Sequence, residues 1–163
     1  MPSKVELRAA TVGDAAFIVE MARHTCIIED WDLPDADSED TQTLLPRGHD
    51  VAVVAGDTTR VRLGAAWTFH HEPPLLLDAG GVALPEIAIA VTPERRGSGI
   101  GGALLDELFV RCAARYEALS LNVHKRNPAS RLYERKGFRV LGQGRGTLGI
   151  VMRKDLRRSA SNS

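Results

Sequence analysis

The stretch TPERRGSGIGGALL, residues 92–105, places two arginines and four glycines between two apolar segments. The partly β-branched residues 83–91 before it predict a buried strand, and the spacing of apolar residues over 100–116 predicts a helix. Glycine has no Cβ, so the backbone can turn tightly here and a ligand can approach bare N–H groups. At a helix start these groups also carry the positive end of the helix dipole, so this corner is predicted to bind an anion.

Three phosphate-binding patterns compete for the corner. A P-loop does not fit, because Gly101 is followed by Gly102 and not by lysine. The dinucleotide pattern G-x-G-x-x-G matches Gly97, Gly99 and Gly102, but the next strand does not end in an acidic residue, and only about 60 residues remain for further βαβ units. The pattern R-x-x-G-x-G at Arg96, Gly99 and Gly101 fits the sequence better.

The composition favours one domain that needs no metal or disulfide to fold. The 163 residues carry 21 basic and 21 acidic side chains, a balance that argues against nucleic-acid binding. No apolar run reaches the roughly 18 residues of a membrane span and the first residues lack a signal-peptide core, so we expect a cytoplasmic protein that does not bind membranes. Cys26 and Cys112 are expected to be reduced and buried. The domain is predicted to cover 1–156 and to be followed by a disordered tail, 157–163.

The remaining periodicities predict further strands and helices. A first helix is predicted over 12–24, with Thr11 and Asp14 at its start. Its apolar stripe is expected on Val12, Ala15, Ala16, Val19 and Ala22. A further helix is predicted over 127–136. Strands are predicted at 5–9, 51–56, 61–70, 118–123, 138–141 and 148–152.

Two segments of the chain resemble the GNAT superfamily of acyl-CoA-dependent N-acetyltransferases. Residues 92–105 resemble its pyrophosphate-binding signature, and LSLNVHKRNPASRLYERKGF, residues 119–138, resembles its second signature. The resemblance implies an α/β (α+β) fold, a mixed, mostly antiparallel sheet of six or seven strands flanked by about four helices. It also implies that strands 83–91 and 118–123 form a splayed parallel pair at the centre, with a bulge near 88–91.

The resemblance implies an N-acetyltransferase that moves an acetyl group from acetyl-CoA, its co-substrate, to a primary amine of a small molecule or peptide. The amine would attack the thioester directly in a ternary complex. The backbone of Ile89 and Val91 would pair with the pantetheine arm, and the Val91 amide would stabilise the oxyanion. The full set of implied acetyl-CoA-binding residues is Ile89, Val91, Arg96, Gly97, Ser98, Gly99, Ile100, Gly101, Asn127, Ser130 and Tyr133. A non-catalytic acyl-CoA-binding or sensor module stays open, as does a homodimer.

Two residues are the candidates for catalysis. Tyr133 is predicted to donate a hydrogen bond or a proton to the departing thiolate, since a tyrosine of ordinary pKa, about 10, is protonated at neutral pH. Glu86 is the first candidate for the general base that takes the proton of the amine. The alternatives are that Tyr133 packs in the core and that Glu86 is a solvated carboxylate. The run His70, His71 and Glu72 supplies the next candidate bases.

The acceptor site is the least determined part. Seven carboxylates lie among residues 29–40, and Glu29, Trp31 and Asp32 are candidate acceptor-binding residues that would attract a cationic amine. Trp67 is a candidate aromatic wall of the site. The alternatives are a solvated loop and a tryptophan in the core. No metal site is expected from residues 70–72, because adjacent strand residues point to opposite faces.

Overall fold

The computed structural model describes residues 5–25, 35–146 and 148–156, and within them it has one seven-stranded mixed sheet. The strand order is β1-β2-β3-β4-β5-β7-β6, and β4–β5 is the parallel neighbour pair. The strands are β1 (Glu6–Ala9), β2 (Ala52–Gly56), β3 (Arg62–Phe69), β4 (Glu86–Val91), β5 (Ala118–His124), β6 (Arg139–Gln143) and β7 (Gly149–Asp155). The predicted fold class is therefore confirmed. The single domain over 1–156 stays a prediction, and the tail at 157–163 lies outside the described residues.

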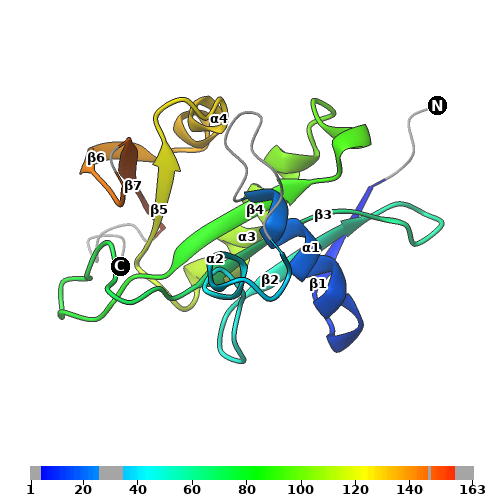
Figure 1. Ribbon diagram of the computed structural model, residues 1–163, viewed down its shortest axis with the longest axis horizontal. Coiled ribbons are helices and arrows are strands. Elements are labelled where there is room, and N and C mark those ends of the chain that lie inside the picture. The colour runs from blue at the N-terminus through cyan, green and yellow to red at the C-terminus, as the bar shows by residue number, and fades with distance from the viewer. Residues whose placement is uncertain (1–4, 26–34, 147, 157–163) are drawn as a thin grey trace, which may run out of the picture.

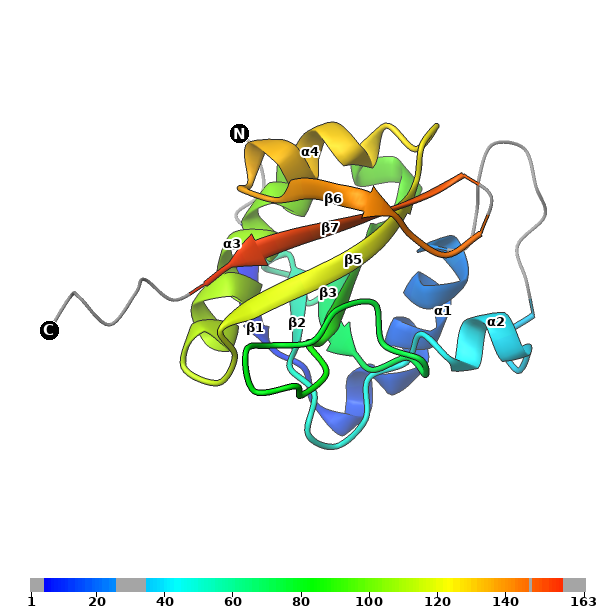
Figure 2. The same ribbon diagram turned by 90° about the vertical axis from the view of Figure 1, so that its left-hand side faces the viewer.

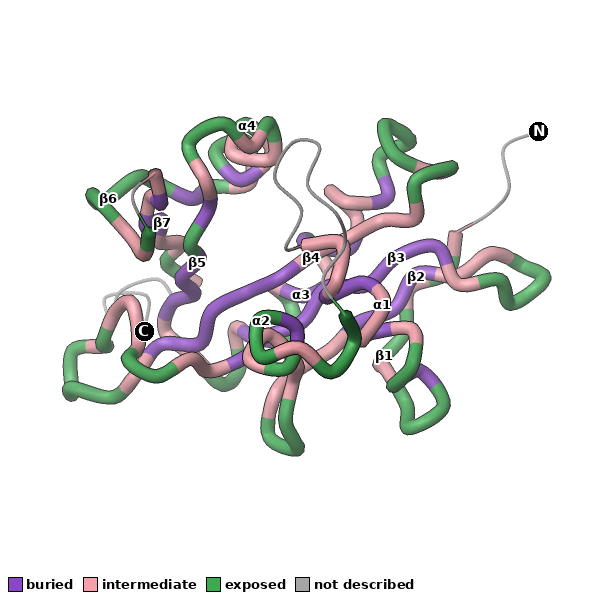
Figure 3. Tube along the Cα trace, viewed as in Figure 1, coloured by how far each residue is buried: buried purple, intermediate pink, exposed green. Residues whose placement is uncertain are grey.

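Helices cover both faces of the sheet (Figures 1 and 2). They are α1 (Ala15–Thr25), α2 (Glu39–Gln42), α3 (Ile100–Ala113) and α4 (Ala129–Arg135), with short 3₁₀ turns η1 (Val12–Asp14) and η2 (Pro93–Arg95). One core lies under α1 and the other under α3, and the middle strands between them are the most buried (Figure 3). The apolar face predicted for the helix after the corner is confirmed, since Ile100, Leu104, Leu108 and Cys112 are all buried.

The parallel pair at the centre of the sheet separates almost at once. Glu86 opposite Ser120 is the one registered pair between β4 and β5. Both the amide and the hydroxyl of Ser120 donate to the Pro85 carbonyl, at 3.0 and 3.1 Å. Beyond this point β5 runs away from β4 (Figure 1). The splay predicted for this pair is present.

The bulge predicted near 88–91 is wrong. The register between β3 and β4 runs without a shift from Phe69 opposite Glu86 to Gly64 opposite Val91. The strands separate because β5 diverges from β4, which needs no inserted residue in the β3–β4 ladder. Close packing of that ladder leaves no room for a side chain at Gly64, where a Cβ would lie 2.9 Å from the Ala90 carbonyl oxygen.

The first helix starts later than expected, and this changes its buried face. The Asp14 carboxylate accepts from the Thr11 amide at 2.7 Å and closes a 3₁₀ turn, so the α-helix begins only at Ala15. Ile18, Met21 and Ala22 are the residues it buries. The predicted stripe is thus wrong except at Ala22, and Val12 is 95% exposed.

Asp14 also fixes the edge of the sheet. Its fully buried side chain accepts hydrogen bonds from Arg8 Nη1 at 2.7 Å and from Arg62 Nε at 2.7 Å. The hydrogen bonds from Arg8 hold the pKa of Asp14 well below its ordinary value, against the opposing effect of burial. The turn after β1 is therefore anchored to β3 by charge as well as by packing.

Candidate active site

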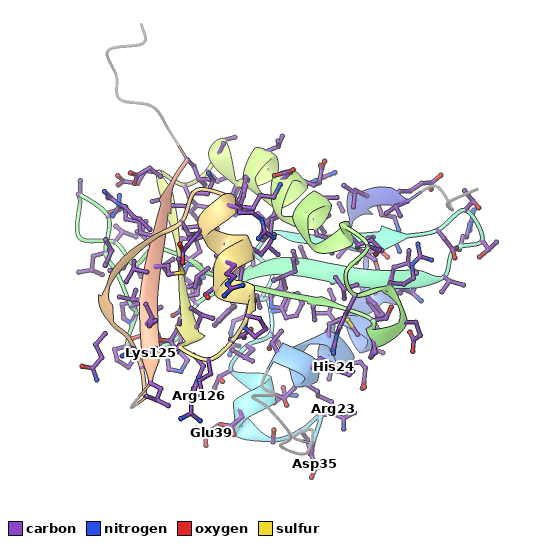
Figure 4. All side chains as sticks on the ribbon, turned by 90° about the horizontal axis from the view of Figure 1, so that it is seen from above. Arg23, His24, Asp35, Glu39, Lys125 and Arg126 are labelled. Atoms are coloured by element: carbon purple, nitrogen blue, oxygen red, sulfur yellow. The ribbon has the colours of Figure 1, made fainter. Side chains whose placement is uncertain are left out.

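A cleft of about 1230 Å³ opens where β4 and β5 separate. Its floor is apolar and comes from β4 and from Val123 of β5. Its rims are the end of α1, α2, the glycine corner at 96–101, the start of α4 and the turn before β7. Figure 4 labels two residues that line the cleft, His24 at the end of α1 and Arg126 in the loop between β5 and α4.

The edge of β4 offers backbone hydrogen-bonding groups to the cleft. On one edge the Thr92 amide donates to Leu63 of β3, and on the other the Pro85 carbonyl accepts from Ser120. Because these groups alternate along a strand, the N–H and C=O groups of Ile89 and Val91 point away from β3 and toward the cleft. This is the orientation that the sequence analysis required of both residues.

The glycine corner has the backbone shape expected for anion binding. Gly97 and Gly99 adopt φ of +79° and +85°, a left-handed conformation in which a side chain is strained. Gly99 is the N-cap of α3, so the first amides of this 14-residue helix have no partner inside it. Arg96, Gly97, Gly99, Ile100 and Gly101 all line the cleft.

The second signature brings α4 to the opposite rim. Asn127 and Tyr133 line the cleft, and the Asn127 side chain accepts from the Ala129 amide at 2.9 Å, which caps the helix. Tyr133 is buried, and its ring meets Phe138 edge-on at 5.8 Å. Burial raises the pKa of the Tyr133 phenol to about 12. Tyr133 therefore both packs in the core and lines the cleft.

Two residues assigned to acetyl-CoA lie outside the cleft lining. The hydroxyl of Ser98 is turned back to the Arg95 carbonyl, to which it donates. Ser130 is half-buried on α4, and its amide donates to the Asn127 carbonyl at 3.1 Å. Neither side chain belongs to the surface of the cleft.

Glu86 is buried, not solvated, and it is paired with an arginine far along the chain. Its side chain is 3% exposed, and Arg145 Nη1 and Nη2 bond its two oxygens at 2.7 and 2.6 Å. Arg145 also donates from Nη2 to the Pro73 carbonyl, and its amide donates to Asn122 Oδ1 at 2.7 Å. This arginine therefore ties the start of β4, the loop after β3 and the turn before β7 together.

Arg145 was not among the predicted site residues, because 59 positions separate it from Glu86 in the chain. The sequence feature that could have pointed to Arg145 is the glycine-rich turn around it. A Cβ on Gly144 would collide with the Asn122 side chain, and a Cβ on Gly149 would collide with the Arg145 carbonyl. These two glycines let the turn fold back on itself and direct Arg145 toward Glu86.

Two histidines present unpaired nitrogens at the same cleft. Among the described residues, the buried side-chain nitrogen and oxygen atoms without a hydrogen-bond partner are Nδ1 of His24 and Nδ1 of His71. Both residues line the cleft. The other nitrogen of His24 faces Glu20 at 3.6 Å, which favours a proton on Nε2 and a lone pair on Nδ1. His71 was a secondary candidate from the sequence, and His24 was missed.

Trp67 does not form a wall of the cleft. It is fully buried between the sheet and the α1 side, and its indole nitrogen donates to the Leu44 carbonyl at 2.7 Å. Both faces of β3 are covered by helices, so alternation along the strand could not distinguish a core position from a site position. Glu29, Trp31 and Asp32 lie outside the described residues, as does Cys26. Of the acid-rich segment, Asp40 lines the cleft.

The charged residues of the cleft are mostly basic. Its lining contains five arginines and two carboxylates, namely Arg95, Arg96, Arg126, Arg135, Arg145, Asp40 and Glu86. Arg145 is already paired with Glu86, and the other four basic groups lie on the rims around the corner and α4. This distribution fits an anionic ligand at the corner end of the cleft.

Comparisons with known proteins agree with this geometry. YncA from Salmonella typhimurium, solved with its cofactor acetyl-CoA, superposes with a TM-score of 0.68 at 24% identity, over 97% of each chain. A phosphinothricin acetyltransferase from Sinorhizobium meliloti, solved with AcCoA, superposes with a TM-score of 0.72 at 24% identity, over 98% of this chain and 92% of the other. At these identities the likeness establishes the fold. Among the described residues, none of the helices has the length and apolarity to cross a bilayer.

Sequence comparisons identify the family. A 5-NmdU N-acetyltransferase of Pseudomonas phage PaMx11 is 35% identical over 68 residues, which are 41% of this chain and 47% of the phage protein. The match thus spans about half the length of that relative. The family model described as an acetyltransferase (GNAT) domain matches residues 48–140, more than half of the chain. The chain therefore belongs to the GNAT acetyltransferase family.

Proposed function

We propose that the protein transfers an acetyl group from acetyl-CoA to a primary amine of a small molecule or peptide. The observation that carries this proposal is the splayed β4–β5 pair. Among the described residues, no strand pairs with the groups of Ile89 and Val91 that point away from β3, beside the glycine corner. A pantetheine arm has amide groups that can pair with such an edge, and a diphosphate can accept from amides at a helix start. One continuous ligand can satisfy both features.

The cofactor end of the cleft, as we use the term, comprises Ile89, Val91, the corner at 96–101 and the start of α4. There the diphosphate would accept hydrogen bonds from the backbone amides of the corner, with arginines of the rim adding charge. The pantetheine arm would continue along β4. The thioester carbonyl would then lie by the Val91 amide, which can donate to the oxyanion as the amine attacks.

Tyr133 would act on the leaving sulfur. When the tetrahedral intermediate collapses, the C–S bond breaks and negative charge develops on sulfur. The raised pKa of Tyr133, about 12, keeps the phenol protonated across the neutral range. Since an ordinary thiol has a pKa of about 8.5, complete transfer of the phenolic proton to a thiolate is uphill. We therefore assign Tyr133 a hydrogen-bond donor role at the sulfur.

The acceptor end comprises Glu86, Arg145, Asn122, Asp40 and the histidines His24 and His71. The Glu86 side chain shares the α1 side of β4 with Ala88, because alternate residues of a strand face the same side. We propose that Glu86 receives the proton of the amine, directly or through a water, while Arg145 holds the carboxylate in place. The unpaired Nδ1 atoms of His24 and His71 would accept hydrogen bonds from the amine.

The acceptor class is proposed from charge and from the relatives. Asp40, the acidic residue of the 29–40 segment that lines the cleft, favours a cationic amine over a neutral one. One similar protein carries the name of an acetyltransferase for phosphinothricin, a small molecule, and another carries the name of a 5-NmdU N-acetyltransferase. A small amine is therefore the first class to screen, ahead of peptides.

Calorimetry with acetyl-CoA, followed by a thiol-release assay over polyamines, amino acids, aminoglycosides and peptides, tests the proposal. We expect one acetyl-CoA per chain and release of free thiol that depends on at least one amine. Uptake of acetyl-CoA with no turnover over the panel would favour a non-catalytic acyl-CoA sensor. If calorimetry registers no uptake, the acetyl-transfer proposal is wrong.

A further inference from the structure

Asp50 is a buried carboxylate that needs a positive partner. Its side chain is fully buried in the loop before β2, and Oδ2 accepts from the Arg47 amide at 2.8 Å. Oδ1 accepts from the Thr68 hydroxyl at 2.9 Å and lies 3.1 Å from His70 Nδ1. Over residues 5–25, 35–146 and 148–156, His70 is the group that pairs with Asp50 across a salt-bridge distance. A carboxylate removed from water is costly unless a cation compensates it.

A second histidine stands beside this pair. The rings of His49 and His70 have centroids 5.1 Å apart and are tilted by 44°. One ligand atom from each of His49, Asp50 and His70 can be chosen so that all three lie within 4.8 Å of one another. Ligand atoms of a tetrahedral zinc site are about 3.4 Å apart, as its bond lengths of about 2.1 Å require. His49 is exposed and can rotate to close the difference.

The neighbours of Asp50 already orient it in the way that a metal ligand is oriented. The Val51 amide donates to the Thr68 hydroxyl oxygen at 3.0 Å, which leaves the hydroxyl hydrogen to Asp50. The Arg47 amide fixes the other oxygen. Such partners hold a first-coordination ligand in place and raise metal affinity. The arrangement is therefore more ordered than a chance meeting of three surface side chains.

From this geometry we propose that His49, Asp50 and His70 bind one divalent zinc-class ion. Two imidazoles and a carboxylate suit zinc better than magnesium or calcium, which prefer oxygen ligands throughout. Three protein ligands leave a fourth position for water. The ion would supply the positive charge that Asp50 needs, and it would clamp the loop before β2 to the end of β3.

The surroundings of the site and its position are compatible with a cation. The site opens on a second hollow, which Arg115, Asp78 and Glu117 also line. Arg115 donates to the His49 carbonyl, and Glu117 lies 3.9 Å from Arg153. His70 lines this hollow, whereas the next residue, His71, lines the cleft. Both histidines follow the end of β3, and they face different hollows. The proposed ligands that join His70, namely His49 and Asp50, come from the loop before β2.

Zinc binding to the untagged full chain tests the proposal directly. Calorimetry with zinc chloride, in the absence of acetyl-CoA and amines, should give one ion per chain. Cobalt(II) should give the visible absorption of a four-coordinate site. His49→Ala should weaken zinc binding by about 10- to 100-fold. His124→Ala is the matched control, since it removes a half-buried histidine outside the proposed ligand set.

The zinc titrations of the wild type and the two variants support or overturn the proposed site. Loss of affinity in His49→Ala but not in His124→Ala supports the site. No uptake by the wild-type chain, or equal uptake by His49→Ala, overturns it and leaves Asp50 and His70 as an anchor of the loop. Because His49 is exposed, His49→Ala should fold normally. Asp50→Asn is a second variant, to be measured after circular dichroism shows that it is folded. The acetyl-transfer proposal is unaffected by either result.

Discussion

The cofactor end and the acceptor end of the cleft are built from different kinds of group. At the proposed cofactor end the groups that would bind the ligand are backbone amides, placed by the β3–β4 ladder and by left-handed glycines. At the acceptor end they are side chains such as Glu86, Arg145 and His71, which come from strand ends and turns. The first end depends on local backbone geometry, and the second depends on contacts between distant segments.

This difference implies that the two ends should fail separately. A change in the corner should weaken acetyl-CoA binding whatever the acceptor is. A change in the Arg145 turn should impair acceptor use and stability while acetyl-CoA binding persists. Tyr133 lines the cleft and is proposed to act on the leaving sulfur, so its loss should affect neither binding step. The following variants test whether the separation holds.

Tyr133→Phe should have the largest effect. It removes one hydroxyl and keeps the ring that packs on Phe138, so we expect kcat to fall about 10²- to 10³-fold. The acetyl-CoA Kd should change less than about threefold, and calorimetry and thiol release measure the two quantities. Tyr116→Phe removes the other tyrosine hydroxyl of the chain and is the control. Normal turnover in Tyr133→Phe would exclude the donor role.

Arg145→Ala should be next. It leaves the Glu86 carboxylate buried without its guanidinium, which for a fully buried pair costs about 3–5 kcal/mol. Since the Arg145 side chain is 28% exposed, we expect the free energy of unfolding to fall by about 2 kcal/mol. Urea unfolding measures this loss. Adding Glu86→Gln should recover part of that loss.

The same variant separates the two ends. Arg145→Ala should raise the acceptor KM and leave the acetyl-CoA Kd within about threefold of the wild type. Arg145→Lys keeps the charge but not the two-pronged geometry, so it should recover stability only in part. A loss confined to acetyl-CoA binding would show that the acceptor end has been misplaced.

Gly99→Val tests the cofactor end. A β-branched residue at φ of +85° is strained by about 1–2 kcal/mol, and its side chain would stand where the ligand approaches the amides. We expect acetyl-CoA affinity to fall about tenfold. Gly48→Val is the control, because Gly48 has no left-handed φ and a Cβ there meets nothing within 4 Å. Unchanged affinity in Gly99→Val would place the diphosphate elsewhere.

Asp14→Asn should have the smallest effect and should spare both ends. It removes the charge that pairs with Arg8 and Arg62, whose side chains are 45% and 39% exposed, so we expect about 1 kcal/mol of destabilisation at pH 7. The pKa of Asp14 is lowered on folding, so its contribution is complete above the unfolded value of about 3.9 and is lost as the pH falls below it. The difference between wild type and variant in thermal unfolding should therefore shrink below about pH 4. A difference that grows at low pH would contradict this.

The same contrast explains what could be predicted from the sequence. The corner at 96–101 and Tyr133 could be proposed as site residues because each lies in a short motif whose geometry is local. Glu86 was placed at the cleft by its strand position, but its pairing with Arg145 depends on tertiary contact. Trp67 was misplaced because helices cover both faces of β3.

The errors in secondary structure have a similar origin. The late start of α1 follows from the Thr11–Asp14 turn, which shifts the buried face by part of a turn. The missing bulge shows that two strands can part without an irregularity in the neighbouring ladder. The buried Cys112 was expected, and burial raises its thiol pKa to about 12, which makes it a poor nucleophile.

Glu86 and Ser120 form the one registered pair that links β4 to β5. Beyond it, the described residues show no ladder between β4 and β5, so β1–β4 are not coupled there to β5, β7 and β6. A bound pantetheine arm would serve as the missing connection. Amide deuterium uptake should then fall on β4 and on β5 together when acetyl-CoA binds, although their backbones do not touch there. The co-substrate would then connect the two parts of the sheet as well as donate the acetyl group.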